Sequence, residues 1–374
     1  MLAVRLTQLL EEHPHRNPQM PDFLLQLGQD FNNWYQALSN GYAILFLFVC
    51  LAGCFIVLAK GADLLVDGAA GLASGLGVPK IIIGVTVVSL GTTLPEVAAS
   101  VSASLRGWGE TATGNAIGSI ICNSGLIFGL CCLLVRLPAD RFTLNRNAWF
   151  QIGGAVLFVL LYFLSGTAVG DQGQRHFYRG FGVILLAGLV AYVLLSLRWA
   201  RQSAKRSAIG AVPRAPSEMK IGRSSLLTAM GFVLVILSAN VLVVVVRELA
   251  GKLGVPNDVV AATLLAFGTS VPELATGIMS VIKGHRELLV GNVIGANILN
   301  IFFVMGASAT VHPLAIPDRF LWLHLPVMLV ILGIFHFNIW TSRDHLKRWP
   351  GLVMLIIYLC YVVGIYFIGS YQLI

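Results

Sequence analysis

Two glutamates lie near the middle of apolar segments, where an ionised side chain is costly. Glu96 belongs to VTVVSLGTTLPE and Glu273 to ATLLAFGTSVPE. Neither is near enough to the end of its segment to reach water, and an ionised group at that depth costs about 2.5–3.5 kcal/mol on insertion scales. Two carboxylates brought together repel each other unless a cation or protons lie between them. Hard cations prefer oxygen ligands of this kind, so the pair predicts a cation site.

Further oxygen atoms share a helical face with each glutamate, because residues three or four positions apart lie on one side of a helix. These residues are Ser89, Thr92 and Thr93 beside Glu96, and Ala266, Thr269 and Ser270 beside Glu273. Pro95 and Pro272 lack an amide proton. We therefore expect each proline to disturb the preceding turn and to free backbone carbonyls near Gly91 and Gly268.

A second polar stripe follows each glutamate segment at four-residue spacing. Its members are Asn115, Ser119 and Asn123 in the first half, and Asn292, Ala296 and Asn300 in the second. We interpret Asn115 and Asn292 as residues that hold helices together by hydrogen bonds. Asn123 and Asn300 are in register with the glutamates, and we predict that they contact the ion.

These two sets of residues are copies of one motif, separated by 177 positions. Between Gly77 and Gly129 the pairing gives 18 identities in 53 positions without an insertion. An odd number of predicted membrane crossings separates equivalent helices, so the two halves must be inverted relative to each other. Inverted repeats of this kind are typical of secondary transporters, whose binding site forms near the midplane where the repeats meet.

The composition is that of an integral membrane protein, with 57% hydrophobic residues, 11% charged residues and a mean hydropathy of +0.82. Ten apolar segments have the length of about 20 residues needed to cross the lipid bilayer as helices. We predict an all-α membrane protein with ten transmembrane helices in two inverted five-helix repeats. The predicted spans are 42–66, 80–105, 112–135, 147–167, 179–199, 224–250, 257–283, 288–311, 320–340 and 351–371.

The predicted domain organisation has four parts. They are an N-terminal extramembrane segment (1–40), a first repeat (41–199), a basic cytoplasmic linker (200–223) and a second repeat (224–374). The net charge of +8 does not indicate nucleic-acid binding in a membrane protein, and the distribution of the basic residues along the chain indicates its orientation instead. Placing the basic linker in the cytoplasm puts most basic loop residues on the same side, which predicts both termini outside a plasma (inner) membrane.

Other polar and sulfur-containing residues have simpler interpretations. Lys60, Asp63 and Asp67 lie at three- and four-residue spacing, and we expect an ion pair with Lys60. The six cysteines form no CxxC pair and are interpreted as small packing residues. Neither HExxH nor GxSxG is present, so the sequence predicts no enzyme and no cofactor.

The two motifs resemble the paired alpha-repeats of the sodium/calcium exchanger family. The resemblance rests on GTTLPE and GTSVPE, followed by GNAIGSIICN and GNVIGANILN. It implies a ten-helix fold in which Glu96 and Glu273 bind calcium and share sodium ions when calcium is absent. The resemblance further implies sodium contacts from Thr92, Thr93, Ser119, Thr269 and Ser270. It implies backbone carbonyl ligands from Ser89 and Ala266, and side-chain oxygen ligands from Asn123 and Asn300.

Two departures from the family pattern affect the ion that is coupled to calcium. Ala296 stands where the family usually has a second serine, so one sodium ligand is missing. Asn300 stands where potassium-dependent relatives have aspartate, which argues against potassium co-transport. The leading hypothesis is a secondary active antiporter that exports calcium in exchange for sodium by alternating access. The alternative is a proton/calcium antiporter on the same scaffold.

Overall fold

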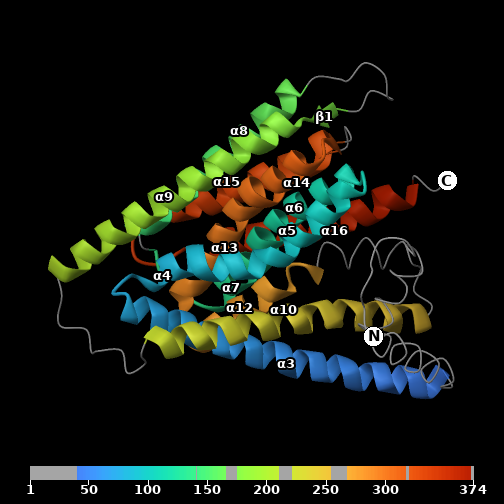
Figure 1. Cartoon of the computed structure of the whole chain (residues 1–374), viewed down its shortest axis with the longest axis horizontal. Coiled ribbons are helices and arrows are strands. Elements are labelled where there is room, and N and C mark those ends of the chain that lie inside the picture. Colours follow the sequence, from blue (N-terminus) through green and yellow to red (C-terminus); the bar gives the residue numbers. More distant parts are fainter. Residues whose placement is uncertain are drawn as a thin grey trace, which may run out of the picture.

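The computed structural model describes residues 40–139, 141–165, 175–209, 221–253, 268–316 and 320–371, and these are almost entirely helical (Figure 1). Residues 1–39 of the predicted N-terminal segment and 210–220 of the predicted linker lie outside this part. The elements of the first half are α3 (Asn40–Gly75), α4 (Lys80–Ile83), η1 (Gly84–Val88), α5 (Ser89–Leu105), α6 (Gly109–Cys122), η2 (Asn123–Phe128), α7 (Gly129–Leu134), α8 (Arg141–Leu164), β1 (Arg175–Phe177) and α9 (Arg179–Ile209). Those of the second half are α10 (Ile221–Lys252), α12 (Val271–Ile282), α13 (Arg286–Leu299), η3 (Asn300–Val304), α14 (Met305–Val311), β2 (Leu314–Ile316), η4 (Phe320–His324), α15 (Leu325–Thr341) and α16 (Arg348–Tyr371).

The fold is that of an all-α membrane protein with ten transmembrane helices in two inverted five-helix repeats, as predicted. Within the described residues, nine helical segments are long and apolar enough to cross a membrane, and α12 is a shorter apolar helix. Residues 257–267 of the seventh predicted span lie outside the described part. The helix α3 is longer than its predicted span, with 36 residues. At 1.5 Å per residue it extends about 54 Å, which is longer than a bilayer core about 30 Å thick, so it must tilt or extend beyond that core.

The inversion of the two halves is visible in the contacts between equivalent helices. A Cβ atom added at Gly61 would meet Val235, and one added at Gly68 would meet Thr228. The residue numbers run in opposite directions along the two helices, so α3 and α10 are antiparallel. They are the first helices of their repeats and lie side by side along one edge of the molecule (Figure 1).

The motif helices occupy the interior, and the remaining helices surround them. In the apolar 18-residue stretch within Arg286–Val311, 94% of the residues are buried, and in those within Gly109–Leu134 and Lys80–Leu105 the shares are 72% and 61%. By contrast, only 22% of the residues are buried in the equivalent stretch of Arg179–Gln202. Charged and amide side chains on the motif helices are therefore enclosed by protein, which is where a membrane protein tolerates them.

The motif helices are also irregular at matched positions. The π-helical segment η2 begins at Asn123, and η3 begins at the repeat counterpart Asn300. A third π-helical segment, η1, directly precedes Ser89. Short π-helical segments are rare and occur frequently at functional sites.

Two loops outside this interior are joined by a small antiparallel sheet of β1 and β2, in which Arg175 pairs with Ile316.

The close contact of α3 and α10 predicts that Gly231 cannot carry a side chain without displacing backbone. A Cβ atom there would lie 2.5 Å from the backbone nitrogen of Leu65. We expect Gly231→Ala to lower the free energy of unfolding by about 1–3 kcal/mol, the usual cost of overpacking. Gly222 in the same helix has open space at the Cβ position, so Gly222→Ala is the matched control. Thermal unfolding of the purified protein in detergent measures both, and equal melting temperatures would contradict the packing.

Candidate cation-binding site

The structure brings the two predicted glutamates together in its interior. Glu96 projects from α5 and Glu273 from the first turn of α12. Both side chains are fully buried, and their carboxyl groups are close enough for their charges to interact. Both helices pack against α13 of the second repeat. The site thus contains one carboxylate from each inverted half.

The polar atoms around this pair lack the partners that buried groups normally have. Among the described residues, none of the four carboxylate oxygens of Glu96 and Glu273 has a hydrogen-bond partner. The same holds for the Thr93 hydroxyl, both side-chain polar atoms of Asn123 and the Oδ1 atom of Asn300. Buried polar groups without a partner are uncommon in folded proteins. Their oxygen chemistry suits a hard cation such as calcium or sodium.

The predicted hydroxyl ligands lie around the same pair. Thr92 and Thr93 are buried on α5 and face the carboxyl group of Glu273 from the opposite repeat. The hydroxyls of Ser119 and Ser270, also from opposite repeats, are 3.4 Å apart. Ser89 uses its own hydroxyl to donate to the carbonyl of Val85 at 2.6 Å. Ala266, the predicted counterpart of Ser89, lies outside the described residues.

The asparagines interpreted as structural do hold the two repeats together. The Thr269 hydroxyl donates to Asn115 Oδ1 at 3.0 Å, and the Thr92 hydroxyl approaches Asn292 Oδ1 at 3.4 Å. Asn115 in turn donates to the Ser100 hydroxyl at 2.8 Å. Each amide therefore links a motif threonine of the other half, and these bonds fix the orientation of the threonines toward the site.

The two prolines differ in their effect, which corrects the expectation of matched breaks. Pro272 lies in the first turn of α12, and Thr269 and Ser270 form a turn before it. Pro95, however, lies inside α5, which remains one helix from Ser89 to Leu105. A proline removes a single backbone hydrogen bond, and the packing around α5 maintains the helix despite that loss.

Sequence reasoning missed two buried residues on the motif helices, and the first of them lies at the site. Cys122 was interpreted as packing, yet its thiol lies against Ser270 and Tyr358 and is close to both glutamates. The sequence feature that could have indicated this role is the position of Cys122 directly before Asn123. Asn297 is the second of these residues, and its spacing does not match the predicted polar stripe. It donates to the Ser124 hydroxyl at 2.7 Å, and its Oδ1 atom has no partner among the described residues.

The ion pair expected for Lys60 forms with a different lysine. Lys283 Nζ lies 2.6 Å from a carboxylate oxygen of Asp63 and 2.6 Å from one of Asp67. Lys283 also donates to the backbone carbonyl of Asp63 at 3.3 Å. It directly follows α12, the helix that carries Glu273 in its first turn, so the interaction joins α3 to the other end of that helix. Local spacing favoured Lys60, but the tertiary fold places Lys283 between both acids.

An inverted-repeat membrane fold with a buried carboxylate pair between its halves defines a secondary ion transporter. The model of the sodium/calcium exchanger protein family matches residues 46–198 and 223–367. The chain belongs to this family.

The chain is also similar to individual proteins and to solved structures over most of its length. The chain is 30% identical over 348 residues to the sodium/calcium exchanger MaX1 of Methanosarcina acetivorans, which covers 86% of this chain and 99% of MaX1. It is 33% identical over 303 residues to the inner membrane protein YrbG of Escherichia coli, which covers 80% of this chain and 90% of YrbG. A structure of the sodium-calcium exchanger NCX_Mj, soaked with 2.5 mM Na+ and 10 mM Sr2+, matches with a TM-score of 0.71 at 25% identity and covers 86% of this chain and 99% of that chain.

The Lys283 interaction predicts which lysine supports the packing of α3. We expect Lys283→Gln to lower the melting temperature, and Lys60→Gln to leave it nearly unchanged. The side chains of Lys283 and Asp63 are 20% and 34% exposed, so the coupling should be about 0.2–1 kcal/mol. Melting temperatures of Lys283→Gln, Asp63→Asn and the double variant measure it. Strictly additive effects, or a larger effect of Lys60→Gln, would contradict the pairing.

Proposed function

We propose that this protein is a secondary active antiporter that exchanges calcium for sodium by alternating access around the Glu96–Glu273 site. The observation that carries the proposal is the pair of buried carboxyl groups without hydrogen-bond partners among the described residues. The family membership, and the names of MaX1 and NCX_Mj, support calcium and sodium as the transported ions.

The proposed ligands are the residues that surround the carboxyl pair. Calcium is bound by Glu96 and Glu273 with side-chain oxygens of Asn123 and Asn300. Sodium ions use the same carboxylates, and their further ligands are the hydroxyls of Thr92, Thr93, Ser119, Thr269 and Ser270 with the carbonyls of Ser89 and Ala266. Burial supports this set, because Glu96, Glu273, Asn123 and Asn300 are all fully enclosed.

Coupling between the ions follows from competition for one negative site. One calcium ion or several sodium ions neutralise two carboxylates, whereas an empty site with two negative charges is costly to enclose. The protein therefore changes its accessible face when it is loaded. A sodium gradient directed into the cell then drives calcium out. We place the protein in the plasma (inner) membrane, with both termini outside and the linker in the cytoplasm.

Calcium flux into proteoliposomes tests the exchange and the roles of the two acids. We expect uptake to depend on an opposing sodium gradient and to be indifferent to potassium. Glu96→Gln and Glu273→Gln should each reduce the rate by about 100-fold or more, because removing one charged member of a buried site costs about 3–5 kcal/mol.

The matched control is Glu248→Gln, since Glu248 is an exposed acid on α10, away from the carboxyl pair. It removes the same charge and should leave the flux unchanged. A calcium flux that does not depend on the sodium gradient, or full activity of both site variants, would overturn the proposal. Single-channel currents through the protein would show that it is a channel and not an antiporter.

A proton/calcium antiporter is the second candidate, and Ala296 is the observation that favours it. Ala296 is fully buried at the position that corresponds to Ser119 in the other repeat. One hydroxyl ligand is therefore missing from the second half, which weakens a sodium site. In this alternative Glu96 and Glu273 carry protons in place of sodium. Calcium flux driven by a pH gradient in sodium-free medium would establish it.

Restoring the missing hydroxyl separates the two candidates. Under sodium exchange, we expect Ala296→Ser to lower the sodium concentration for half-maximal flux by about tenfold, since an oxygen contact to a charged group contributes on the order of 1.5 kcal/mol. Ala309→Ser adds a hydroxyl at another buried position of the same transmembrane helix and should have no such effect. Unchanged sodium dependence in Ala296→Ser would exclude position 296 from the sodium site.

A further inference from the structure

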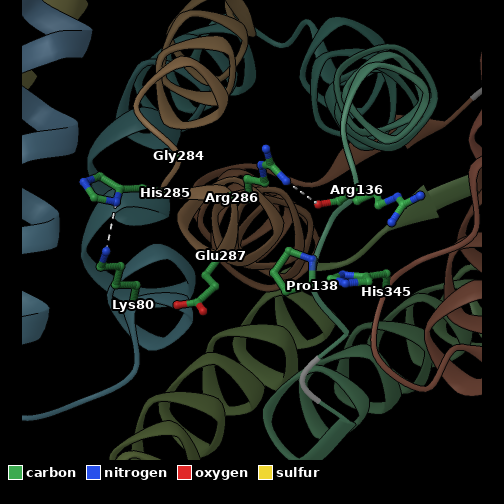
Figure 2. A pocket seen from close by; sticks show the side chains of 8 residues that line it. All are labelled: Lys80, Arg136, Pro138, Gly284, His285, Arg286, Glu287 and His345. Atoms are coloured by element: carbon green, nitrogen blue, oxygen red, sulfur yellow. Dashed lines mark hydrogen bonds between the residues drawn. The ribbon is translucent and has the colours of Figure 1, made fainter. Parts of the chain in front are cut away.

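A pocket of about 180 Å³ lies where loops from both repeats meet, apart from the buried glutamates (Figure 2). It is formed by the start of α4, the segment between α7 and α8, the beginning of α13, and the segment between α15 and α16. The residues that line it are Lys80, Arg136, Pro138, Gly284, His285, Arg286, Glu287 and His345. The charge distribution of the sequence places this end of the helices in the cytoplasm.

The pocket carries an excess of positive charge. Lys80, Arg136 and Arg286 are basic residues, and Glu287 is the one acidic residue in its lining. None of these three cations forms an ion pair within the part of the chain that the structure describes. The Nε atom of Arg286 is buried and has no hydrogen-bond partner among the described residues. A buried guanidinium donor of this kind normally has an acceptor, so the pocket is suited to an anion.

The cations are held in place by contacts that leave donors available. Arg286 donates through Nη1 to the backbone carbonyl of Arg136 at 3.1 Å, which joins α13 to the α7–α8 segment (Figure 2). Lys80 Nζ lies 2.9 Å from His285 Nδ1, and the ammonium group must be the donor. His285 is thus neutral on that nitrogen, in agreement with its pKa, which burial and then the charge of Lys80 lower from the ordinary value.

The backbone adds to the pocket in two ways. Gly284 has a φ of +74°, which allows the sharp turn that starts α13 inside the pocket. The amide groups at the start of this helix carry partial positive charge, and the residue before Arg286 provides no side-chain cap. The opposite wall is fixed because the Ala139 amide donates to the Asp344 carbonyl and the Leu346 amide to the Leu137 carbonyl, both at 2.9 Å.

We propose that this pocket binds a phosphate group of an anionic ligand at Arg286, with Lys80 and Arg136 on its two sides adding positive charge (Figure 2). Guanidinium groups suit phosphate oxygens because they donate two parallel hydrogen bonds. Either the headgroup of an anionic phospholipid or a soluble phosphate supplies this chemistry. The location at the helix ends matches the headgroup layer, where basic pockets between transmembrane helices bind such lipids. Occupancy would join the loop that precedes α13 to both neighbouring loops.

The test uses the full-length protein in detergent with three additions: phosphatidylglycerol, phosphatidylcholine and inorganic phosphate. Thermal unfolding at increasing concentrations of each gives an apparent affinity. We expect phosphatidylglycerol to stabilise the wild type and phosphatidylcholine not to do so. Arg286→Gln should weaken the effect about fivefold, which corresponds to about 1 kcal/mol per basic residue at an anionic surface. Stabilisation by inorganic phosphate at similar concentrations would identify a soluble ligand at the same site.

The control is Arg343→Gln, since Arg343 is an exposed cation between α15 and α16 that does not line the pocket. It removes the same charge and should retain the wild-type response. If Arg286→Gln does not fold, Lys80→Gln tests the pocket in its place. Equal stabilisation by both lipids and no response to phosphate would overturn the proposal, as would equal losses in Arg286→Gln and Arg343→Gln.

The titration of His285 gives a second readout that does not depend on stability. In the free protein its pKa should lie below its ordinary value, because burial and the charges of Lys80 and Lys283 disfavour the imidazolium form, although Asp67 opposes them. A bound phosphate brings negative charge into the pocket and should raise this pKa. NMR of histidine-labelled protein, assigned with His285→Asn, measures the change. An unchanged pKa at saturating ligand would contradict binding in this pocket.

Discussion

Two carboxyl groups enclosed in the membrane interior need positive charge, and this requirement explains much of the architecture around them. Glu96 and Glu273 are fully buried and without hydrogen-bond partners among the described residues. Inversion of the repeats lets α5 and α12 contribute one acid each. The amides of Asn115 and Asn292 hold threonines of the opposite half beside the pair. The site is thus shared between halves that are each incomplete alone.

The sequence was sufficient for this arrangement because the repeat is itself a spatial constraint. A shared motif 177 positions apart, with an odd number of crossings between copies, requires inversion. Polar residues on one face of a central helix then have to meet their counterparts. Local irregularity was harder to predict: Pro95 lies inside a continuous helix, whereas π-helical segments begin at Asn123 and Asn300. Such segments depend on packing between helices, which residue spacing does not report.

Contacts between distant loops were also beyond the sequence. Spacing along α3 favoured Lys60 as the partner of Asp63, yet Lys283 takes that place from another helix. The basic pocket draws its lining from four separate segments, which include Lys80 and Arg136, so no local pattern marks it. Charge counting placed these residues on one side of the membrane. It could not indicate which of them line one pocket.

The two repeats differ in the contacts that α3 and α10 make with the rest of the molecule, and this difference has an electrostatic consequence. Lys283 follows α12, and its counterpart Arg106 follows α5. Lys283 bridges two acids of α3, whereas α10 has Asn240 and Val244 at the matching positions. Asn240 instead donates to the carbonyl of Ile236, and Arg106 lies over the ring of Trp108. Among the described residues, α3 is therefore joined by a salt bridge to the residue that follows α12, and no equivalent salt bridge joins α10 to the residue that follows α5. Because salt screens interactions between partly exposed charges, added salt should weaken the packing of α3 more than that of α10.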